Sequence, residues 1–309
     1  MERHRHIGYQ GLLGLLLVLV CWPLAWLGWD PVSRYSFFPL WLGFVLTLDG
    51  LNEWRSRTSL WRRGKRHFVL LFAISAPFWW IFEWVNRYLR DWHYVTPLNH
   101  SLLVYALLAT LDFSTVIPAV LEMTELLASF RLGSRLPRIP AWRASPVGIT
   151  VLEALGWFML LLVILLPDYF FPLTWIALFL IVEPFNLAVG QRSVGWFLAR
   201  GESSALWNLM LGALATGWFW EMWNYYSLPK WYYTVPYVDF WHVWEMPLLG
   251  YGGYLPFGLE VMSVFALGFW LLERRPQRYT RIVGRQAAET ARVGADGREH
   301  APAPARSRP

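Results

Sequence analysis

Charged residues and cysteines are both scarce in this 309-residue chain, and each scarcity excludes a class of protein. Only 16% of the residues are charged and 56% are hydrophobic, against about 25% and about 45 to 50% in soluble domains. The chain is therefore not expected to fold as an ordinary soluble domain. Cys21 is the only cysteine, which excludes disulfides within the chain and thiolate metal clusters.

Sequence motifs for several chemistries are also missing. No two of the seven histidines are three or four positions apart, so the histidine box of membrane di-iron oxygenases is absent. The chain has no P-loop, nucleophile elbow or dinucleotide fingerprint. We predict neither a metal nor a cofactor, because the residues that could bind a metal have no recognised ligand spacing. These residues are His93, Glu122, Glu125, Glu153 and His242.

Long apolar stretches make up most of the chain. Eight of them have close to the length, about 20 residues, at which a helix crosses a hydrocarbon core. Runs such as 12–20 and 157–166 are almost continuously apolar and lack the alternation of barrel strands. We therefore predict an all-α integral membrane protein with about eight transmembrane helices. The predicted spans are 8–29, 37–52, 68–86, 101–130, 147–166, 171–186, 205–223 and 246–272.

Basic residues are distributed unevenly between the two sides of these spans. Of the 27 Lys and Arg residues, 23 fall on the side that holds both termini. Under the positive-inside rule, this bias predicts that both termini are cytoplasmic. The expected location is the inner (plasma) membrane of the cell. The net charge of +6 then reflects topology and anionic lipid headgroups, and it does not indicate nucleic-acid binding.

The chain also resembles itself at a spacing of 133 to 139 residues, which indicates an internal duplication. Residues 80–88 match 218–226, and both segments contain the pattern Trp-x-x-Glu-x-x-Asn. Three shorter matches keep the same order along the chain. They are Phe-Phe-Pro-Leu at 37–40 and 170–173, Trp-x-Tyr at 92–94 and 231–233, and Pro-x-x-x-Glu at 118–122 and 256–260.

This duplication predicts the domain organisation. Repeat 1 covers residues 1–145, repeat 2 covers 146–276, and each contains four helices. An even number of helices per copy gives the two repeats the same, parallel orientation, unlike the inverted repeats of several transporters. Residues 277–309 are rich in Arg, Ala, Gly and Pro, and we predict a disordered basic cytoplasmic tail there.

Three acidic positions inside the predicted helices are duplicated. A carboxylate at membrane depth costs about 2.5 to 3.5 kcal/mol on insertion scales, so it indicates a functional site by default. In two of the three pairs an asparagine follows at i+3, on the same helix face. The pairs are Asp49 and Glu183 (with Asn52 and Asn186), Glu83 and Glu221 (with Asn86 and Asn224), and Glu122 and Glu260.

Tryptophans surround Glu83 and Glu221 in the sequence, which makes this pair the strongest catalytic candidate. We predict that the two glutamates act as a proton donor and its partner, and that Asn86 and Asn224 orient them. A ligand-binding role without catalysis stays open for the same pair. The residues predicted to bind substrate are Asp49, Asn52, Trp80, Trp84, Glu122, Glu183, Asn186, Trp218, Trp220, Trp223 and Glu260.

A structural role is an open alternative for Asp49 and Glu183 with their asparagines. Basic loops follow both positions, so these side chains could cap helices or pair with loop arginines. The aromatic segment 231–245 also has two interpretations. It is denser in aromatic residues than an interfacial belt requires, which favours a lid or re-entrant segment over a pocket, while a surface-lying anchor helix is the alternative.

Some of these motifs resemble the heterodimer-type carotenoid (lycopene) cyclase domain family. The resemblance rests on Asp-x-x-Asn at 49–52, Glu-Pro-x-Asn at 183–186, the Trp-Tyr-Tyr at 231–233 and Pro-x-x-x-Glu at 256–260. It implies carboxylate-mediated protonation of an isoprenoid double bond. The chain departs from the family in lacking a Glu-Glu pair after proline, in having a fourth helix per copy and in its heavier aromatic content.

Three functions are consistent with these patterns. The first is an intramembrane enzyme that acts on an isoprenoid, carotenoid-like or other lipidic substrate by carboxylate acid–base chemistry. The second is a lipid or small-solute carrier or binding protein, and the third is a structural or assembly membrane protein whose polar residues join helices. The expected partners are membrane lipids or a hydrophobic small molecule, and the sequence predicts no oligomeric state.

Overall fold

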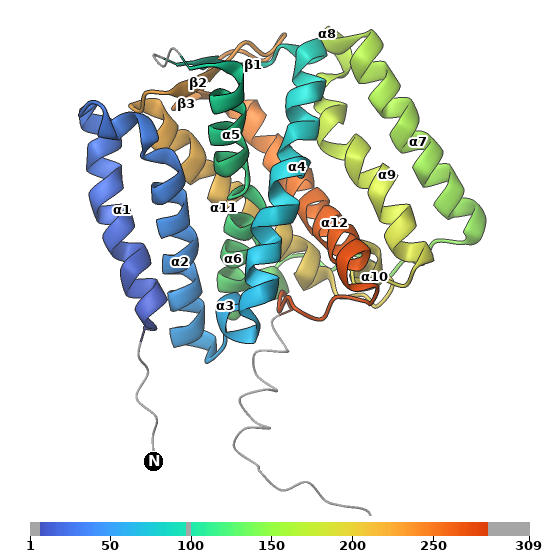
Figure 1. Ribbon diagram of the computed structural model, residues 1–309. Coiled ribbons are helices and arrows are strands. Elements are labelled where there is room, and N and C mark those ends of the chain that lie inside the picture. The colour runs from blue at the N-terminus through green and yellow to red at the C-terminus, as the bar shows by residue number, and fades with distance from the viewer. Residues whose placement is uncertain (1–6, 97–99, 284–309) are drawn as a thin grey trace, which may run out of the picture.

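A computed structural model describes residues 7–96 and 100–283 of the chain. Long helices stand side by side in a single bundle, and short strands lie across one end of it (Figure 1). The helices are α1 (Tyr9–Leu27), α2 (Phe37–Ser56), α3 (Leu60–Arg63), α4 (Lys65–Leu89), α5 (Leu102–Phe113), α6 (Val116–Ser129), α7 (Pro146–Leu165), α8 (Pro167–Phe170), α9 (Thr174–Ala188), α10 (Val194–Leu198), α11 (Ser203–Tyr225) and α12 (Tyr254–Glu273). The strands are β1 (Trp92–Val95), β2 (Lys230–Tyr233), β3 (His242–Val243) and β4 (Met246–Pro247).

Six helical segments among the described residues are long and apolar enough to cross a membrane. They are Tyr9–Leu27, Lys65–Leu89, Leu102–Ser129, Pro146–Leu165, Pro167–Ala188 and Leu248–Glu273. The prediction of a helical, multi-pass membrane protein is therefore confirmed. Two further long helices, α2 and α11, run beside these six (Figure 1), and polar residues such as Asp49 and Asn208 lie within them.

The outermost helices, α1 and α7, each pack mainly against one neighbour and lie on opposite flanks of the bundle (Figure 1). Glycines allow these contacts to be close. A Cβ on Gly11 of α1 would lie 2.7 Å from Gly50 Cα of α2, and one on Gly156 of α7 would lie 2.8 Å from the Ile181 nitrogen of α9. The remaining faces of α1 and α7 carry exposed leucines, valines and aromatic residues, as lipid-facing surfaces should.

The fourth predicted span is interrupted at Ser114. Helix α5 ends at Phe113 and α6 begins at Val116, and the hydroxyls of Ser114 and Thr115 bond carbonyl groups at the break. Thr115 Oγ1 donates to Asp112 O at 2.7 Å. Ser75 of α4 spans the gap, since its Oγ donates to Phe113 O at 2.6 Å and accepts from Ile117 N at 3.0 Å. The break leaves Asp112 at the end of a short helix, beside the pocket described below.

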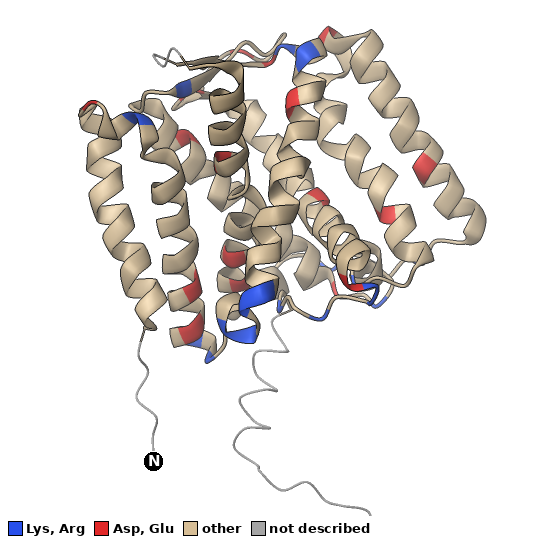
Figure 2. Ribbon diagram, viewed as in Figure 1, with Lys and Arg blue, Asp and Glu red and all other residues tan. Residues whose placement is uncertain are grey.

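The two ends of the described chain lie at the same end of the bundle, together with α3 and α10 (Figure 1). Many of the Lys and Arg residues gather at this end (Figure 2), which we call the basic end. Residues 277–283, which the sequence analysis assigned to a disordered tail, are packed here. Arg63 Nε donates to Tyr279 O at 2.7 Å, and Asn208 Nδ2 donates to Ile282 O at 2.9 Å. Residues 284–309 of the predicted tail lie outside the described residues.

Candidate functional site

A two-stranded antiparallel ribbon covers the end of the bundle opposite the basic end (Figure 1). Strand β1 follows α4 and strand β2 follows α11, and the two strands pair with each other. His93 lies opposite Tyr232 at the centre of the ribbon, and their rings stack with centroids 5.1 Å apart. The two copies of the Trp-x-Tyr motif therefore pair with one another. The aromatic segment 231–245 forms strands and turns here, and not an anchor helix.

Asn86 and Asn224 attach this ribbon to the helices. The Asn86 amide donates to Trp92 O at 2.7 Å, and its oxygen accepts from the Asp91 nitrogen at 3.0 Å. The Asn224 amide donates to Trp231 O at 2.7 Å and accepts from Trp231 N at 2.8 Å. Both asparagines thus pair with backbone as a neighbouring strand would. They position the strands that carry Tyr94 and Tyr233, which bond the glutamates, whereas the sequence analysis predicted that the asparagines orient the glutamates.

Glu83 accepts three hydrogen bonds on one carboxylate oxygen. Tyr94 Oη donates to Glu83 Oε1 at 2.5 Å, and the indole nitrogens of Trp79 and Trp92 donate at 3.0 Å and 3.1 Å. Two of these donors come from β1 and the third lies one helical turn before Glu83. Three donors to a carboxylate hold it in a defined orientation. Glu83 is half-buried.

Glu221 is the glutamate of the second Trp-x-x-Glu-x-x-Asn motif, and its side chain is fully buried. Tyr233 Oη and Tyr254 Oη both donate to Glu221 Oε1 at 2.7 Å. Trp231 Nε1 in turn donates to Tyr233 Oη at 2.9 Å. The second oxygen, Oε2, is buried and has no hydrogen-bond partner among the described residues. One oxygen of Glu221 is therefore anchored while the other keeps its bonding capacity.

The two glutamates obtain their third aromatic neighbour in different ways. Trp79 supplies an indole from α4 in the first half, but the matching position of α11, 138 residues later, is Gly217. A Cβ on Gly217 would lie 2.5 Å from the Tyr254 ring, so the missing side chain leaves the space that Tyr254 occupies. Tyr254 in turn matches Val116 of the first half. Trp79 of α4 thus lies beside Glu83, and Tyr254 of α12 lies beside Glu221.

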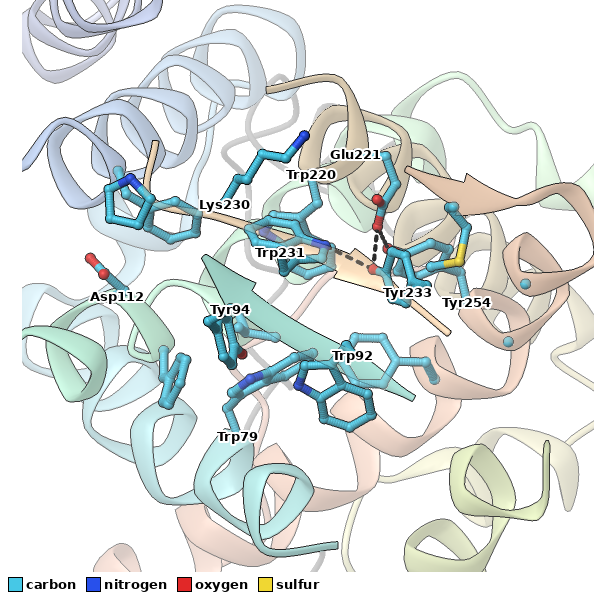
Figure 3. Close-up of a pocket in the computed structure, with 18 of the residues that line it drawn as sticks. Trp79, Trp92, Tyr94, Asp112, Trp220, Glu221, Lys230, Trp231, Tyr233 and Tyr254 are labelled. Atoms are coloured by element: carbon cyan, nitrogen blue, oxygen red, sulfur yellow. Dashed lines mark hydrogen bonds between the residues drawn. The ribbon is translucent and has the colours of Figure 1, made fainter. Parts of the chain in front are cut away.

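A pocket of about 170 Å³ lies beneath the ribbon, between the two glutamate networks. Figure 3 shows rings from both strands and from α4, α11 and α12 around it. Glu221 lines the pocket directly, whereas Glu83 is reached only through the rings that donate to it. Eleven of the twenty lining residues are aromatic: Phe37, Trp79, Trp92, Tyr94, Phe113, Trp175, Trp220, Trp231, Tyr233, Tyr254 and Phe257.

Asp49 and Glu183 lie near the basic end, away from this pocket. Asp49 Oδ1 accepts from Trp61 N at 2.8 Å, and Glu183 Oε1 accepts from Gly195 N at 2.5 Å. Both donors lie in the first turn of a short helix, α3 or α10. These carboxylates therefore satisfy free backbone N–H groups at helix N-termini. This geometry corresponds to the capping alternative raised for the pair.

The remaining duplicated polar residues lie inside the helical bundle. Asn52 Nδ2 donates to Glu122 Oε2 at 2.7 Å, and Asn186 Nδ2 donates to Ser263 O at 2.9 Å. Glu260 is fully buried, and neither of its carboxylate oxygens has a hydrogen-bond partner among the described residues. None of these residues lines the aromatic pocket.

The five tryptophans predicted to bind substrate have different environments. Trp220 lines the pocket. Trp223 is buried against Trp41, with ring centroids 5.1 Å apart. Trp80 Nε1 donates to Thr110 Oγ1 at 2.9 Å, while Trp84 and Trp218 are exposed on the bundle surface. The structure therefore places one of the five in the pocket.

Sequence reasoning missed most of the residues that build the pocket. Tyr94 and Tyr233, which bond the glutamates, belong to the repeated Trp-x-Tyr motif, which was recognised as a repeat but not among the predicted site residues. Tyr254 and Asp112 gave weaker signals, since Tyr254 has no aromatic counterpart in the first half and Asp112 stood out only as a charge within an apolar span. The useful signal would have been the aromatic residues that recur at similar sequence distances after Glu83 and after Glu221.

No family model, curated protein or solved structure matches the chain. Within residues 7–96 and 100–283, no three His, Cys, Asp or Glu side chains gather closely enough to form a metal site. Any assignment of function therefore depends on the geometry and chemistry of the pocket itself.

Proposed function

We propose that this protein is an intramembrane enzyme that binds a lipidic substrate in the aromatic pocket and acts on it by acid–base chemistry at Glu221. The substrate would be isoprenoid, carotenoid-like or another long apolar molecule. One observation carries the proposal: a fully buried carboxylate opens onto a cavity that is lined mainly by aromatic rings. Apolar walls with a few placed polar groups are typical of small-molecule sites.

The hydrogen bonds of Glu221 suit a proton donor. With Oε1 anchored by two tyrosine hydroxyls, a proton carried on Oε2 has no acceptor among the described residues. In the proposed reaction this proton is transferred to a substrate double bond. The ring faces around the pocket would stabilise the positive charge that forms. Glu83 would support the opposite wall through Tyr94 and the two indoles.

The same proposal includes a duplicated, eight-helix architecture. Equivalent contacts support it: Asp49 bonds Trp61 N and Glu183 bonds Gly195 N, both partners lying twelve residues further on. The antiparallel pairing of the two Trp-x-Tyr motifs is the arrangement expected around a two-fold axis. With both termini in the cytoplasm and the chain in the inner (plasma) membrane, the pocket would lie near the opposite face.

A lipid or small-solute carrier is the second candidate. The observation in its favour is that Glu122 and Glu260 also hold carboxylate oxygens without described partners inside the bundle, as residues that load and release a proton or cation would. A purely structural protein would use the same groups to join helices. These functions predict different effects of replacing Glu83 and Glu221 by glutamine on the lipid content of the cells and on the folded yield.

Comparison of lipid and pigment extracts tests the proposal. Cells that express the wild type and the Glu83→Gln/Glu221→Gln double variant would be extracted, with the solubilised folded yield measured in parallel. We expect a lipid species that is present in only one of the two extracts at equal yield. Identical extracts at equal yield would contradict catalysis and favour a carrier, and a collapsed yield would favour a structural role.

A further inference from the structure

Asp112 is a second carboxylate in the wall of the aromatic pocket, and the proposed reaction does not use it. It lies at the end of α5, where the chain breaks before α6. Its side chain has no hydrogen bond or ion pair with any described residue. Figure 3 shows it at the end of the pocket opposite Glu221, with Trp231 and Tyr94 between them.

The two cations that line the pocket are already neutralised. Arg34 forms an ion pair with Asp30, and Lys230 forms one with Glu245. Lys230 Nζ also donates to Tyr225 O at 3.3 Å, and Figure 3 shows its amine end directed away from Asp112. Neither cation is therefore positioned to balance the Asp112 carboxylate.

The pocket thus combines one unpaired carboxylate, that of Asp112, with aromatic faces. Asp112 has no ion pair among the described residues, and eleven of the twenty residues that line the wall are aromatic. A positive charge is attracted both by a carboxylate and by the faces of tryptophan and tyrosine rings. An anion would be repelled by the carboxylate and by the ring faces.

We propose that the pocket selects an amphiphile with a positively charged nitrogen, that its apolar chain lies among the rings, and that its cationic group binds at Asp112. The inference rests on the proposed function of the pocket and narrows the substrate from any lipid to a cationic one. A quaternary or protonated amine next to a hydrocarbon chain has the required chemistry.

Charge-matched probes test this proposal on the full chain in nanodiscs of uncharged or zwitterionic lipid. Hexyltrimethylammonium and hexyl sulfate have similar apolar chains and opposite charges, and quenching of tryptophan fluorescence would report their binding. We expect the ammonium to bind at least about tenfold more tightly, as for a ligand charge that pairs with a desolvated partner. Equal affinities, or tighter binding of the sulfate, would overturn the proposal.

Two variants locate the charge preference. Asp112→Asn should remove it, whereas Asp168→Asn, which neutralises an exposed carboxylate of α8 at the same end of the bundle, should retain it. Unchanged ammonium affinity in folded Asp112→Asn would contradict the proposal.

If Asp112→Asn does not fold, Glu245→Gln provides an independent test, because it releases Lys230 from its ion pair. We expect weaker ammonium binding and stronger sulfate binding, and no change in either would contradict the proposal. A charge preference that persists when the lipid extracts show no product would reject only the enzyme proposal. Product formation without the preference would reject only the cationic substrate.

Discussion

Two pairs of duplicated carboxylates lie near opposite ends of this bundle, and the groups that donate to them differ. Asp49 and Glu183 accept hydrogen bonds from backbone N–H groups of short helices near the basic end. Beneath the ribbon, Glu83 and Glu221 accept hydrogen bonds from tyrosine hydroxyls. Glu83 also accepts hydrogen bonds from indole N–H groups. Duplication and membrane depth alone therefore do not distinguish a folding role from a chemical one. The two pairs differ in their donors, and only the second pair lies beside the cavity.

The largest effect is expected at Glu183. It accepts from Gly195 N and from the hydroxyls of Ser193 and Ser263, both at 2.6 Å. Glu183→Ala leaves these buried donors unsatisfied, at about 1 to 3 kcal/mol each. We expect the folded yield in size-exclusion chromatography to collapse. Glu153→Ala removes an exposed carboxylate of α7 and should leave the yield unchanged, and similar yields for both variants would contradict the capping role.

A glycine substitution sharpens the comparison between the two glutamate networks. Gly217→Ala would place a Cβ 2.5 Å from the Tyr254 ring and displace the hydroxyl that bonds Glu221. Overpacking of this kind costs about 1 to 3 kcal/mol, and we expect a lower melting temperature. Gly252→Ala is the matched control, because no atom lies within 4 Å of its Cβ position. Equal melting temperatures for the two variants would contradict the close packing of Tyr254 against Gly217.

The asparagine pair tests how the ribbon is held. Asn224→Asp keeps the acceptor for Trp231 N but loses the amide that donates to Trp231 O, while Asn224→Ala loses both. Each lost hydrogen bond is worth about 1 kcal/mol. Hydrogen exchange of the β2 amides should therefore accelerate in Asn224→Asp and more so in Asn224→Ala. Exchange at the wild-type rate in both variants would show that the ribbon is held by other contacts.

A further prediction concerns Asp91, which lies between α4 and the ribbon. Burial, with a lesser contribution from the Asp168 carboxylate, raises the pKa of Asp91 from 3.8 to about 7. The folded state thus favours the protonated acid, and stability is lost as pH rises through this range. Asp91→Asn should therefore raise the melting temperature at pH 8 and leave it nearly unchanged at pH 4. A pH-independent difference between variant and wild type would contradict this assignment.

The sequence was informative about the helices because apolar length and charge distribution are local properties. The runs around 12–20 and 157–166 indicated spans that the structure contains as α1 and α7. It was less informative about the break between α5 and α6, because Ser75, which bonds both sides of that break, belongs to another helix. The packing of residues 277–283 was missed for a similar reason, since their partners Arg63 and Asn208 are distant in the chain.

The candidate site could be predicted only in part. Glu221 and Trp220 were selected from the sequence and line the pocket. Asp49 and Glu183 gave the same sequence signal as Glu221 but bond backbone, a difference that only tertiary structure decides. Tyr254 was missed because its role follows from the absence of a side chain at Gly217.

The most direct test of the division between the two carboxylate pairs compares two double variants with the same chemistry. Glu83→Gln/Glu221→Gln and Asp49→Asn/Glu183→Gln each replace two carboxylates by amides of nearly equal size. Folded yield and melting temperature would be measured for both in the same detergent. The account predicts near wild-type values for the first variant and a marked loss for the second. A collapse of the first variant together with a stable second would contradict it.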